Sequence, residues 1–198
     1  EGLFNQIRGF GSYGFPESHS ASFALLAYAS SYIKRHHPAV FTCALLNSLP
    51  MGFYSASQLV QDAQRHGVAI RPVDVTASRW ETILEETGSA RPVIRFGMNR
   101  ISGMGKAAAE RIAAARSEQA FTGIADLAHR AALNKRDLEL LAEADALVSL
   151  AGHRREAGWE TAVVRVRNDL LDGLPIREER PLLAAPGEAE SLVADYAT

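Results

Sequence analysis

Helix-compatible segments in this chain are short, and each one ends at a proline, a glycine or a polar turn. From Ser18 to Arg35 apolar residues recur every three to four positions, which predicts a helix. Proline suits the first turn of a helix but disfavours helix at the preceding residue, so Pro38 ends this run and begins a second, to about Leu49. A third helix, Gln58 to His66, is expected to end at Gly67. The pattern predicts a chain of short helices.

The second half of the chain continues this pattern after a stretch of extended residues. Residues 68–75 are rich in β-branched side chains and contain a proline, so we expect them to be extended. Residues 80–84 and 93–97 flank a turn rich in Thr, Gly and Ser, which predicts a two-stranded β-hairpin. Further helices are expected at 106–116, 124–131, 136–144 and 188–196. We expect 152–186 to be a poorly packed linker, because prolines and polar residues interrupt it.

Composition restricts the class of protein. With 47% hydrophobic residues and a net charge of −2, the chain has the composition of a soluble protein with a core. It contains no apolar run of about 18 residues and no signal-peptide pattern, which argues against membrane and secreted classes. Cys43 is the only cysteine and the six histidines show no zinc-site spacing, so we expect neither a disulfide nor a metal site. A reducing, cytoplasmic location is expected, and the start without Met suggests a piece of a longer protein.

Positive charge is concentrated in one block, residues 91–118. Two acidic residues, Glu110 and Glu118, face six basic ones there, a net charge of +4: Arg91, Arg95, Arg100, Lys106, Arg111 and Arg116. Binding to phosphate depends on local rather than net charge. A polyanionic partner is therefore expected to contact this block first.

The block contains a glycine-rich turn, Ile101 to Lys106, at which two helices are expected to meet. Gly103 and Gly105 permit a tight turn whose backbone N–H groups point outward at the positive end of the helix dipole. Met104 can insert into the core, Ala109 leaves room for a close helix crossing, and Ile112 can pack inward. The spacing resembles the helix-hairpin-helix motif, which binds the DNA backbone without reading bases. The candidate DNA-binding residues are Arg100, Ser102, Gly103, Met104, Gly105, Lys106 and Arg111.

Residues 138–147 resemble a second, degenerate hairpin in which Asp145 occupies the place of the expected glycine. An acid there repels phosphate, so we assign this hairpin a structural role. The predicted fold class is mainly α: a bundle of short helices with a small β-hairpin and a tandem helix-hairpin-helix-like module. The plainer alternative is that both hairpins only allow close helix packing.

The N-terminal segment carries a second resemblance. Residues 9–38 read GFGSYGFPESHSASFALLAYASSYIKRHHP and resemble the fingers region of bacterial C-family DNA polymerases, the family of the DNA polymerase III alpha subunit. Residues 68–80, 94–98 and the hairpin at Gly103 follow in the family's order, and 189–196 resemble the segment before its OB domain. Pro16-Glu17, where replicative members commonly carry Asn-Lys, is more similar to the error-prone branch used in translesion synthesis.

This resemblance implies a parent protein that is a DNA-directed DNA polymerase, using Mg²⁺ ions held by palm aspartates. No Asp-x-Asp pair occurs in this chain, so we expect it to bind no cofactor and to be inactive alone. The expected partners are primer-template DNA and, for the parent, the incoming dNTP and accessory mutagenesis proteins. Residues 168–183 contain no Gln-x-x-Leu-Phe-like run, which argues against direct binding to the sliding clamp.

Within the fingers-like segment, six residues are expected to contact nucleotide or template. They are the phosphate partners Arg8, Lys34 and Arg35, and the hydrogen-bonding group Ser18, His19 and Ser20 at a helix start. The aromatic and apolar residues at helical spacing in this segment are expected to be core: Phe23, Leu26, Tyr28 and Tyr32.

The resemblance also predicts three parts. They are the C-terminal part of the fingers (1–75), the β-hairpin with the DNA-binding helix-hairpin-helix module (76–151), and a linker and helix leading to a further domain (152–198). Two other functions fit parts of the sequence. A stand-alone DNA-binding repair or accessory module would use the same hairpin, and a structural helical interaction domain would explain the Ala and Leu content.

Overall fold

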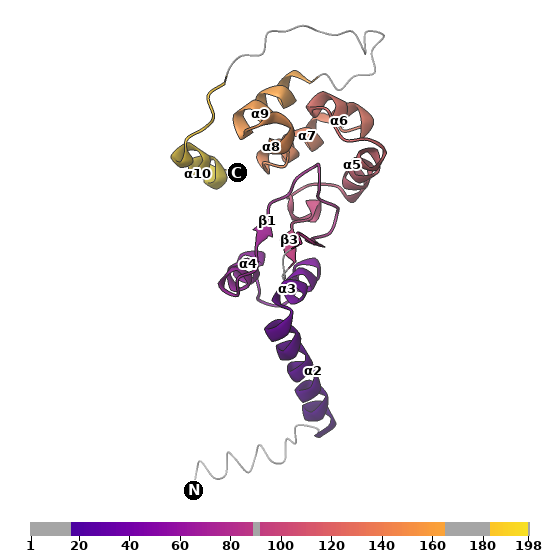
Figure 1. Ribbon diagram of the computed structural model, residues 1–198, viewed down its shortest axis with the longest axis vertical. Helices are drawn as coiled ribbons and strands as arrows, with labels where there is room; N and C mark the ends of the chain where they lie inside the picture. Colours follow the sequence, from indigo (N-terminus) through magenta and orange to yellow (C-terminus); the bar gives the residue numbers. More distant parts are fainter. Residues whose placement is uncertain (1–16, 89–91, 165–182, 198) are drawn as a thin grey trace. The chain divides into compact units, whose positions relative to one another are not determined.

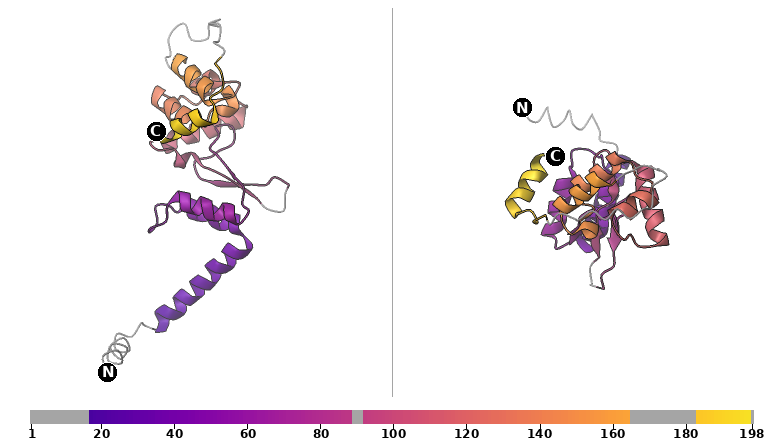
Figure 2. Two further views of the ribbon diagram at one scale, coloured as in Figure 1. Left: turned by 90° about the vertical axis from the view of Figure 1, so that its left-hand side faces the viewer. Right: turned by 90° about the horizontal axis from the view of Figure 1, so that it is seen from above.

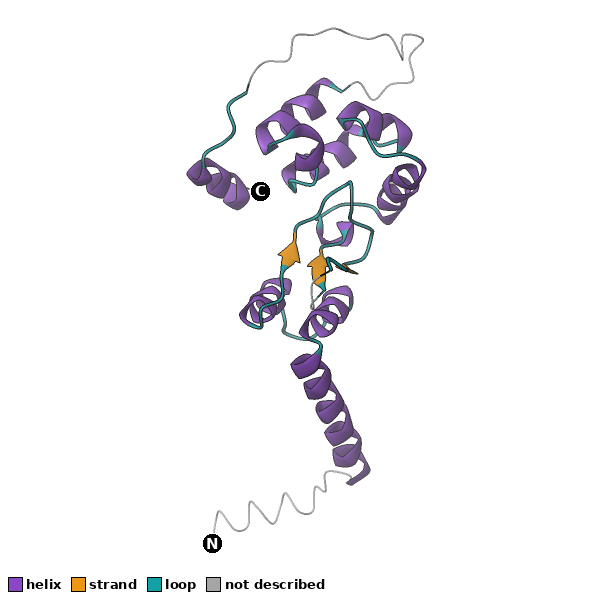
Figure 3. Ribbon diagram, viewed as in Figure 1, coloured by secondary structure: helices purple, strands orange, loops and turns teal. Residues whose placement is uncertain are grey.

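The computed structural model describes residues 17–88, 92–164 and 183–197, with side chains described for 19–88, 92–164 and 183–194 (Figure 1). The chain divides into two compact units, residues 1–68 and 69–198. Helices predominate, and the described strands are short (Figure 3). This confirms the predicted fold class. None of the described helices is both long enough and apolar enough to cross a membrane.

The first unit contains α2 (Glu17–His36), α3 (Pro38–Asn47) and α4 (Ala56–Arg65), in agreement with the three predicted helices. Pro38 is the first residue of α3. Ser55 caps α4 in a reciprocal capping box, in which its hydroxyl accepts a hydrogen bond from the Gln58 N–H and the Gln58 side chain accepts one from the Ser55 N–H. Gly67 follows α4 with φ +74°, as expected of a helix-ending glycine.

The core of this unit lies between α3 and α4 rather than along α2. Leu46, Leu59 and Ala63 are buried there. In contrast, Phe23, Leu26, Tyr28 and Tyr32 of α2 are 51% to 72% exposed, so the prediction that they are core residues is wrong within the described structure. Apolar helical spacing identifies a face that packs against something, and this unit contains no described element that covers it.

The second unit begins with a three-stranded sheet in the order β1-β3-β2. The predicted hairpin forms from β2 (Ile83–Glu85) and β3 (Val93–Arg95), which are antiparallel. The structure adds β1 (Ile70–Arg71), which pairs in parallel with the other edge of β3, and Ile94 in this central strand is completely buried. Gly97 follows β3 where the backbone passes very close to Glu81, and a Cβ at that position would be only 2.3 Å from the Glu81 carbonyl carbon. Glycine is required there because no side chain fits.

A 3₁₀ turn, η1 (Met98–Arg100), leads from the sheet into a group of helices that all of the views show together (Figures 1 and 2). The helices are α5 (Lys106–Glu118), α6 (Ile124–Arg130), α7 (Lys135–Glu143), α8 (Val148–Ala151), α9 (Arg154–Val163) and α10 (Glu188–Ala197). Buried side chains of α5, α6, α7 and α9 form one continuous core that includes Ile112, Leu127 and Leu138, and Val75 and Leu147 from the connecting segments belong to it.

Two sequence predictions in this unit need correction. Residues 154–163, expected to be part of a poorly packed linker, form α9, which packs against α6, α7 and α8. Its buried face consists of Ala157 and Thr161, one turn apart. Because the charged residues 154–156 precede this short face, the sequence pattern does not indicate a packed helix. The remainder of that linker up to residue 182 lies outside the described residues. In addition, a single 3₁₀ turn, not an α-helix, precedes the hairpin at Gly103.

Candidate nucleic-acid interface

The turn between η1 and α5 exposes backbone while its apolar residues are held in the core. Gly103 has φ +79°, a conformation that costs an L-residue with a side chain roughly 1–2 kcal/mol. Ile101 and Met104 are buried on either side of it, which confirms that Met104 inserts into the core. Ser102, Gly103 and Gly105 are exposed. The two buried side chains therefore hold the turn against the core, and its glycine backbone is accessible to solvent.

The N-terminus of α5 opens onto this turn without a cap. Gly105 is the N-cap residue, no side chain bonds to the first turn, and that turn contains no acidic residue. By contrast, α4 and α7 have complete capping boxes, made by Ser55 and by Asn134. The first N–H groups of a helix lack partners within the helix and carry its positive dipole end. An anion is thus the natural partner for the start of α5.

The two flanking cations are available at the surface. Lys106 is the first residue of α5, and its Nζ lies 3.8 Å from Glu110 Oε1, with both side chains more than 60% exposed. Such an exposed, long pair contributes little to stability and does not block other contacts. Arg100 is partly exposed, and its Nε donates a 3.4 Å hydrogen bond to Asn99 Oδ1.

Other arginines of the basic block bind the protein's own backbone. Arg95 is buried, donates to the carbonyl oxygen of Pro72 at 3.0 Å and pairs with Glu85 at 2.8 Å. Arg116 donates to the carbonyl oxygens of Val75 and Ser78, and burial lowers the pKa of its guanidinium, which stays charged because arginine is not deprotonated in proteins. The +4 charge of residues 91–118 therefore overstates the charge that faces solvent.

Arg111, a predicted DNA-binding residue, also has internal partners. Its Nε and Nη2 atoms donate to the carbonyl oxygens of Ala131 and Ala132 at 2.8 and 3.2 Å, just after α6. The guanidinium also lies 3.9 Å from Asp137 Oδ2. These contacts tie α5 to the α6–α7 connection, and a DNA contact by Arg111 stays a prediction.

Arg136, which the sequence did not single out, lies beside the hairpin turn. A Cβ placed on Gly103 would be 3.6 Å from its Nη2 atom and equally close to a Leu140 methyl group. Arg136 is exposed in the first turn of α7, next to Lys135. Two cations at the positive end of a helix oppose its dipole. The two cations at the start of a predicted helix are a signal that the sequence alone contains, once the start of α7 is known.

The second hairpin repeats the positive-φ turn residue of the first, but it carries an acidic side chain at that residue. Asp145 has φ +56°, which confirms that it stands where a glycine is expected. The next two residues, Ala146 and Leu147, are fully buried, and α8 follows. The Asp145 carboxylate accepts a 2.7 Å hydrogen bond from Arg154 Nε. The acid of this turn is therefore neutralised from within the protein.

The predicted fingers contacts belong to the first unit, and the structure brings only some of them into view. Arg8 and the side chain of Ser18 lie outside the described residues. His19 and Ser20 are exposed in the first turns of α2, where the His19 and Phe23 rings are 4.3 Å apart. Arg35 is exposed in the last turn.

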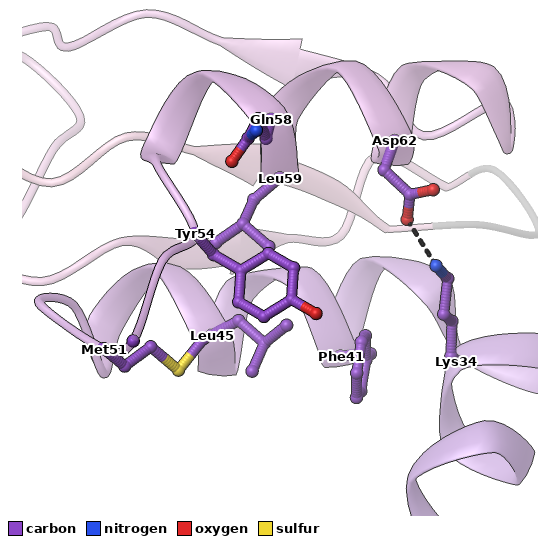
Figure 4. Close-up of a pocket in the computed structure, with 9 residues that line it drawn as sticks. Lys34, Phe41, Leu45, Met51, Tyr54, Gln58, Leu59 and Asp62 are labelled. Atoms are coloured by element: carbon purple, nitrogen blue, oxygen red, sulfur yellow. Dashed lines mark ion pairs between the residues drawn. The ribbon is translucent and has the colours of Figure 1, made fainter.

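Lys34 already has an acidic partner. Its Nζ lies 2.8 Å from Asp62 Oδ2, and this hydrogen bond lowers the pKa of Asp62 (Figure 4). The pair stands at the edge of a cavity of about 720 Å³, whose other lining residues are mostly apolar: Phe41, Leu45, Met51, Gly52, Tyr54, Gln58 and Leu59. Among the described residues no group of three potential metal ligands occurs, there or elsewhere. A mostly apolar lining of this kind is typical of a surface against which other side chains pack.

Comparisons with known proteins find similarity in both units of the chain. The family model described as "Helix-hairpin-helix motif" matches residues 67–157, the sheet and helices α5 to α8 with the start of α9. Proteins named "Error-prone DNA polymerase" are similar along the whole chain. That of Azoarcus sp. (strain BH72) is 57% identical over 202 residues, which cover 100% of this chain. That of Dechloromonas aromatica (strain RCB) is 58% identical over 98% of the chain, and that of Alkalilimnicola ehrlichii 54% over 99%. The chain spans 19% of the length of these curated relatives.

Proposed function

We propose that this chain, which matches a segment of error-prone DNA polymerases along its whole length, is the part of such a polymerase that holds duplex DNA by its backbone. The second unit supplies the DNA-binding hairpin and the first unit supplies part of the fingers. The three-part division at residues 75 and 151 stays part of this proposal. So does a cytoplasmic location.

The uncapped start of α5 at the Gly103–Lys106 turn carries the proposal. Its free N–H groups, its open glycine backbone and the cations Arg100 and Lys106 suit a phosphate group. Contacts with phosphate position a protein on DNA without specifying sequence. Such a site serves a polymerase, which must bind every sequence that it copies.

Nucleotide transfer belongs to other parts of the polymerase. The whole protein is expected to transfer nucleotides to a primer end with Mg²⁺ held by aspartates outside this chain. We expect this chain alone to bind primer-template DNA without extending it. In the first unit, His19, Ser20 and Arg35 stay candidates for contacts with the incoming dNTP or the template. Lys34 must first leave Asp62 to join them. Accessory mutagenesis proteins remain expected partners of the whole polymerase.

The direct test is fluorescence anisotropy of this chain with a labelled primer-template duplex across a salt series. Wild type should bind and weaken steeply with salt, because each phosphate contact releases counterions. Arg100→Glu combined with Lys106→Glu should abolish binding at all sequences alike. Arg79→Glu, a charge reversal at an exposed residue outside the hairpin, is the control and should retain binding.

The outcomes separate the possible functions. If folded wild type does not bind, the hairpin only packs helices, and the result supports the function of a structural interaction domain. If it binds, adding the rest of the polymerase chain distinguishes the two DNA-binding functions. Restored primer extension supports a polymerase segment, and no extension supports a stand-alone DNA-binding module.

A further inference from the structure

We propose that Arg136 contacts a DNA phosphate at the first hairpin. In the second hairpin, the carboxylate of Asp145 corresponds to this phosphate. The inference rests on the proposed function, because it needs DNA at the Gly103 turn. It adds a binding residue from α7 to a site otherwise built from η1 and α5.

At the first hairpin, Arg136 and Leu140 lie beside a turn residue that has no side chain. Gly103 has no side chain, and its would-be Cβ lies 3.6 Å from the Arg136 Nη2 atom. The structure records no ion pair or side-chain hydrogen bond of Arg136 with any described residue. A guanidinium presents several N–H donors in a planar fork that matches the oxygens of a phosphate. An anion at the uncapped start of α5 would supply the acceptors that Arg136 lacks.

At the second hairpin, the corresponding place is filled. Asp145 is also a positive-φ residue, and its carboxylate binds Arg154 Nε at 2.7 Å. The other nitrogen atoms of Arg154 donate to the carbonyl oxygens of Glu143 and Ser191 at 3.4 and 3.3 Å. The second hairpin thus shows an arginine from a later helix pairing with an anion at the turn, and here that anion belongs to the protein.

The sequence around Arg136 supports a role outside stability. Lys135 and Arg136 begin α7, where the dipole favours acids, and Asp137 is the one acidic residue of that first turn. Violations of a local rule concentrate at functional sites. Arg136 is the one of the two that lies against the hairpin turn, which makes Lys135 a matched control.

The test measures the affinity of the full 198-residue chain for a labelled primer-template duplex over a salt series. Arg136→Gln should weaken binding about tenfold near 0.1 M salt and reduce the slope of log K against log salt by about one. Lys135→Gln removes the same charge in the same helical turn and should change affinity less than about twofold. Gly103→Asp should rebuild the second hairpin's pair and weaken binding, with Arg136→Gln adding no further loss to the affinity that remains in that background.

Two results would overturn the inference, and they can be told apart. If wild type binds and Lys106→Glu weakens it, but Arg136→Gln behaves like Lys135→Gln, Arg136 has no phosphate contact and the proposed function stands. If folded wild type does not bind DNA, the proposed function fails and the inference fails with it. Circular dichroism of each variant ensures that only folded proteins are compared, and Arg136→Gln decides the outcome if Gly103→Asp does not fold.

Discussion

Arg116 donates a hydrogen bond from Nη1 to the carbonyl oxygen of Val75 at 2.7 Å, across 41 positions of the sequence. The same nitrogen lies 2.8 Å from the carbonyl oxygen of Ser78. Arg116 lies in the basic block that the sequence assigns to DNA, yet its charge is used inside the protein. The distinction between structural and exposed arginines can be measured.

Arg116→Ala should lower the free energy of unfolding by about 2–3 kcal/mol, because it leaves backbone acceptors without a charged donor. Urea unfolding followed by circular dichroism measures this loss. DNA affinity of the folded protein should stay within about twofold of wild type. Arg100→Ala is the matched control and should show the reverse, a loss of affinity with little change in stability. Equal stability of the two variants would contradict this assignment.

Two residues with positive φ should respond in opposite directions to substitution. Gly103→Ala places a Cβ at φ +79° and should destabilise the protein by about 1 kcal/mol. Ala132, at φ +47° after α6, already bears that cost, so Ala132→Gly should stabilise by about 0.5–1 kcal/mol. Thermal unfolding of both variants tests the backbone conformation directly. Destabilisation by Ala132→Gly would show that the turn after α6 has a different conformation.

Gly105→Asp should improve stability while it weakens DNA binding. Asp is a preferred N-cap, and Gly105 has an ordinary extended conformation with no atom within 4 Å of an added Cβ. A gain of a few tenths of a kcal/mol is expected from capping α5. The new carboxylate would occupy the N–H groups offered to phosphate and repel it.

Gly123→Asp adds the same charge at the N-cap of α6, which also has open space, and should leave DNA affinity nearly unchanged. Anisotropy and thermal unfolding of the pair separate the two effects. If both variants weaken binding equally, the loss reflects total charge and not the start of α5.

Sequence patterns predicted most helices because the signals are local. The proline at 38 and the glycine at 67 each act on the few residues beside them. The predicted hairpin turn at Gly103 and the unusual Asp145 were also found, since a required positive φ restricts residue type. These features depend on no distant partner.

The predictions failed where distant partners decide. The pairing of β1 with β3 depends on residues more than twenty positions apart, and two residues are too few to show a strand pattern. The internal roles of Arg95 and Arg116 depend on carbonyl and carboxylate groups from other elements. Arg136 was missed for the same reason, because only the packing of α7 brings it to Gly103.

The sheet should show a stability change in mild acid. Glu85 accepts hydrogen bonds from Arg95 and Arg71, and the bond from Arg95 is the main cause that lowers its pKa below the usual 4.5. A carboxyl whose pKa is lower in the folded state stabilises the protein above its unfolded pKa and loses this contribution as the pH falls through the folded value. Glu85→Gln should therefore cost about 1–3 kcal/mol at pH 7 and progressively less below about pH 4.5.

Urea unfolding at several pH values between 7 and 3 measures this difference. Glu86→Gln, at the exposed neighbouring residue, is the control and should follow wild type throughout. A constant difference between Glu85→Gln and wild type across this range would show that the carboxylate charge does not contribute.

The internal bonds of Val75 also determine an order of events during synthesis. Its N–H donates to Ala146 in the second hairpin, and its carbonyl oxygen accepts from Arg116 in α5. When this segment is synthesised, both partners are still untranslated. Contacts between distant residues form slowly and leave the waiting segment exposed. Residues 73–78 can therefore reach their final conformation only after the second hairpin has emerged, so the second unit completes its folding late in translation.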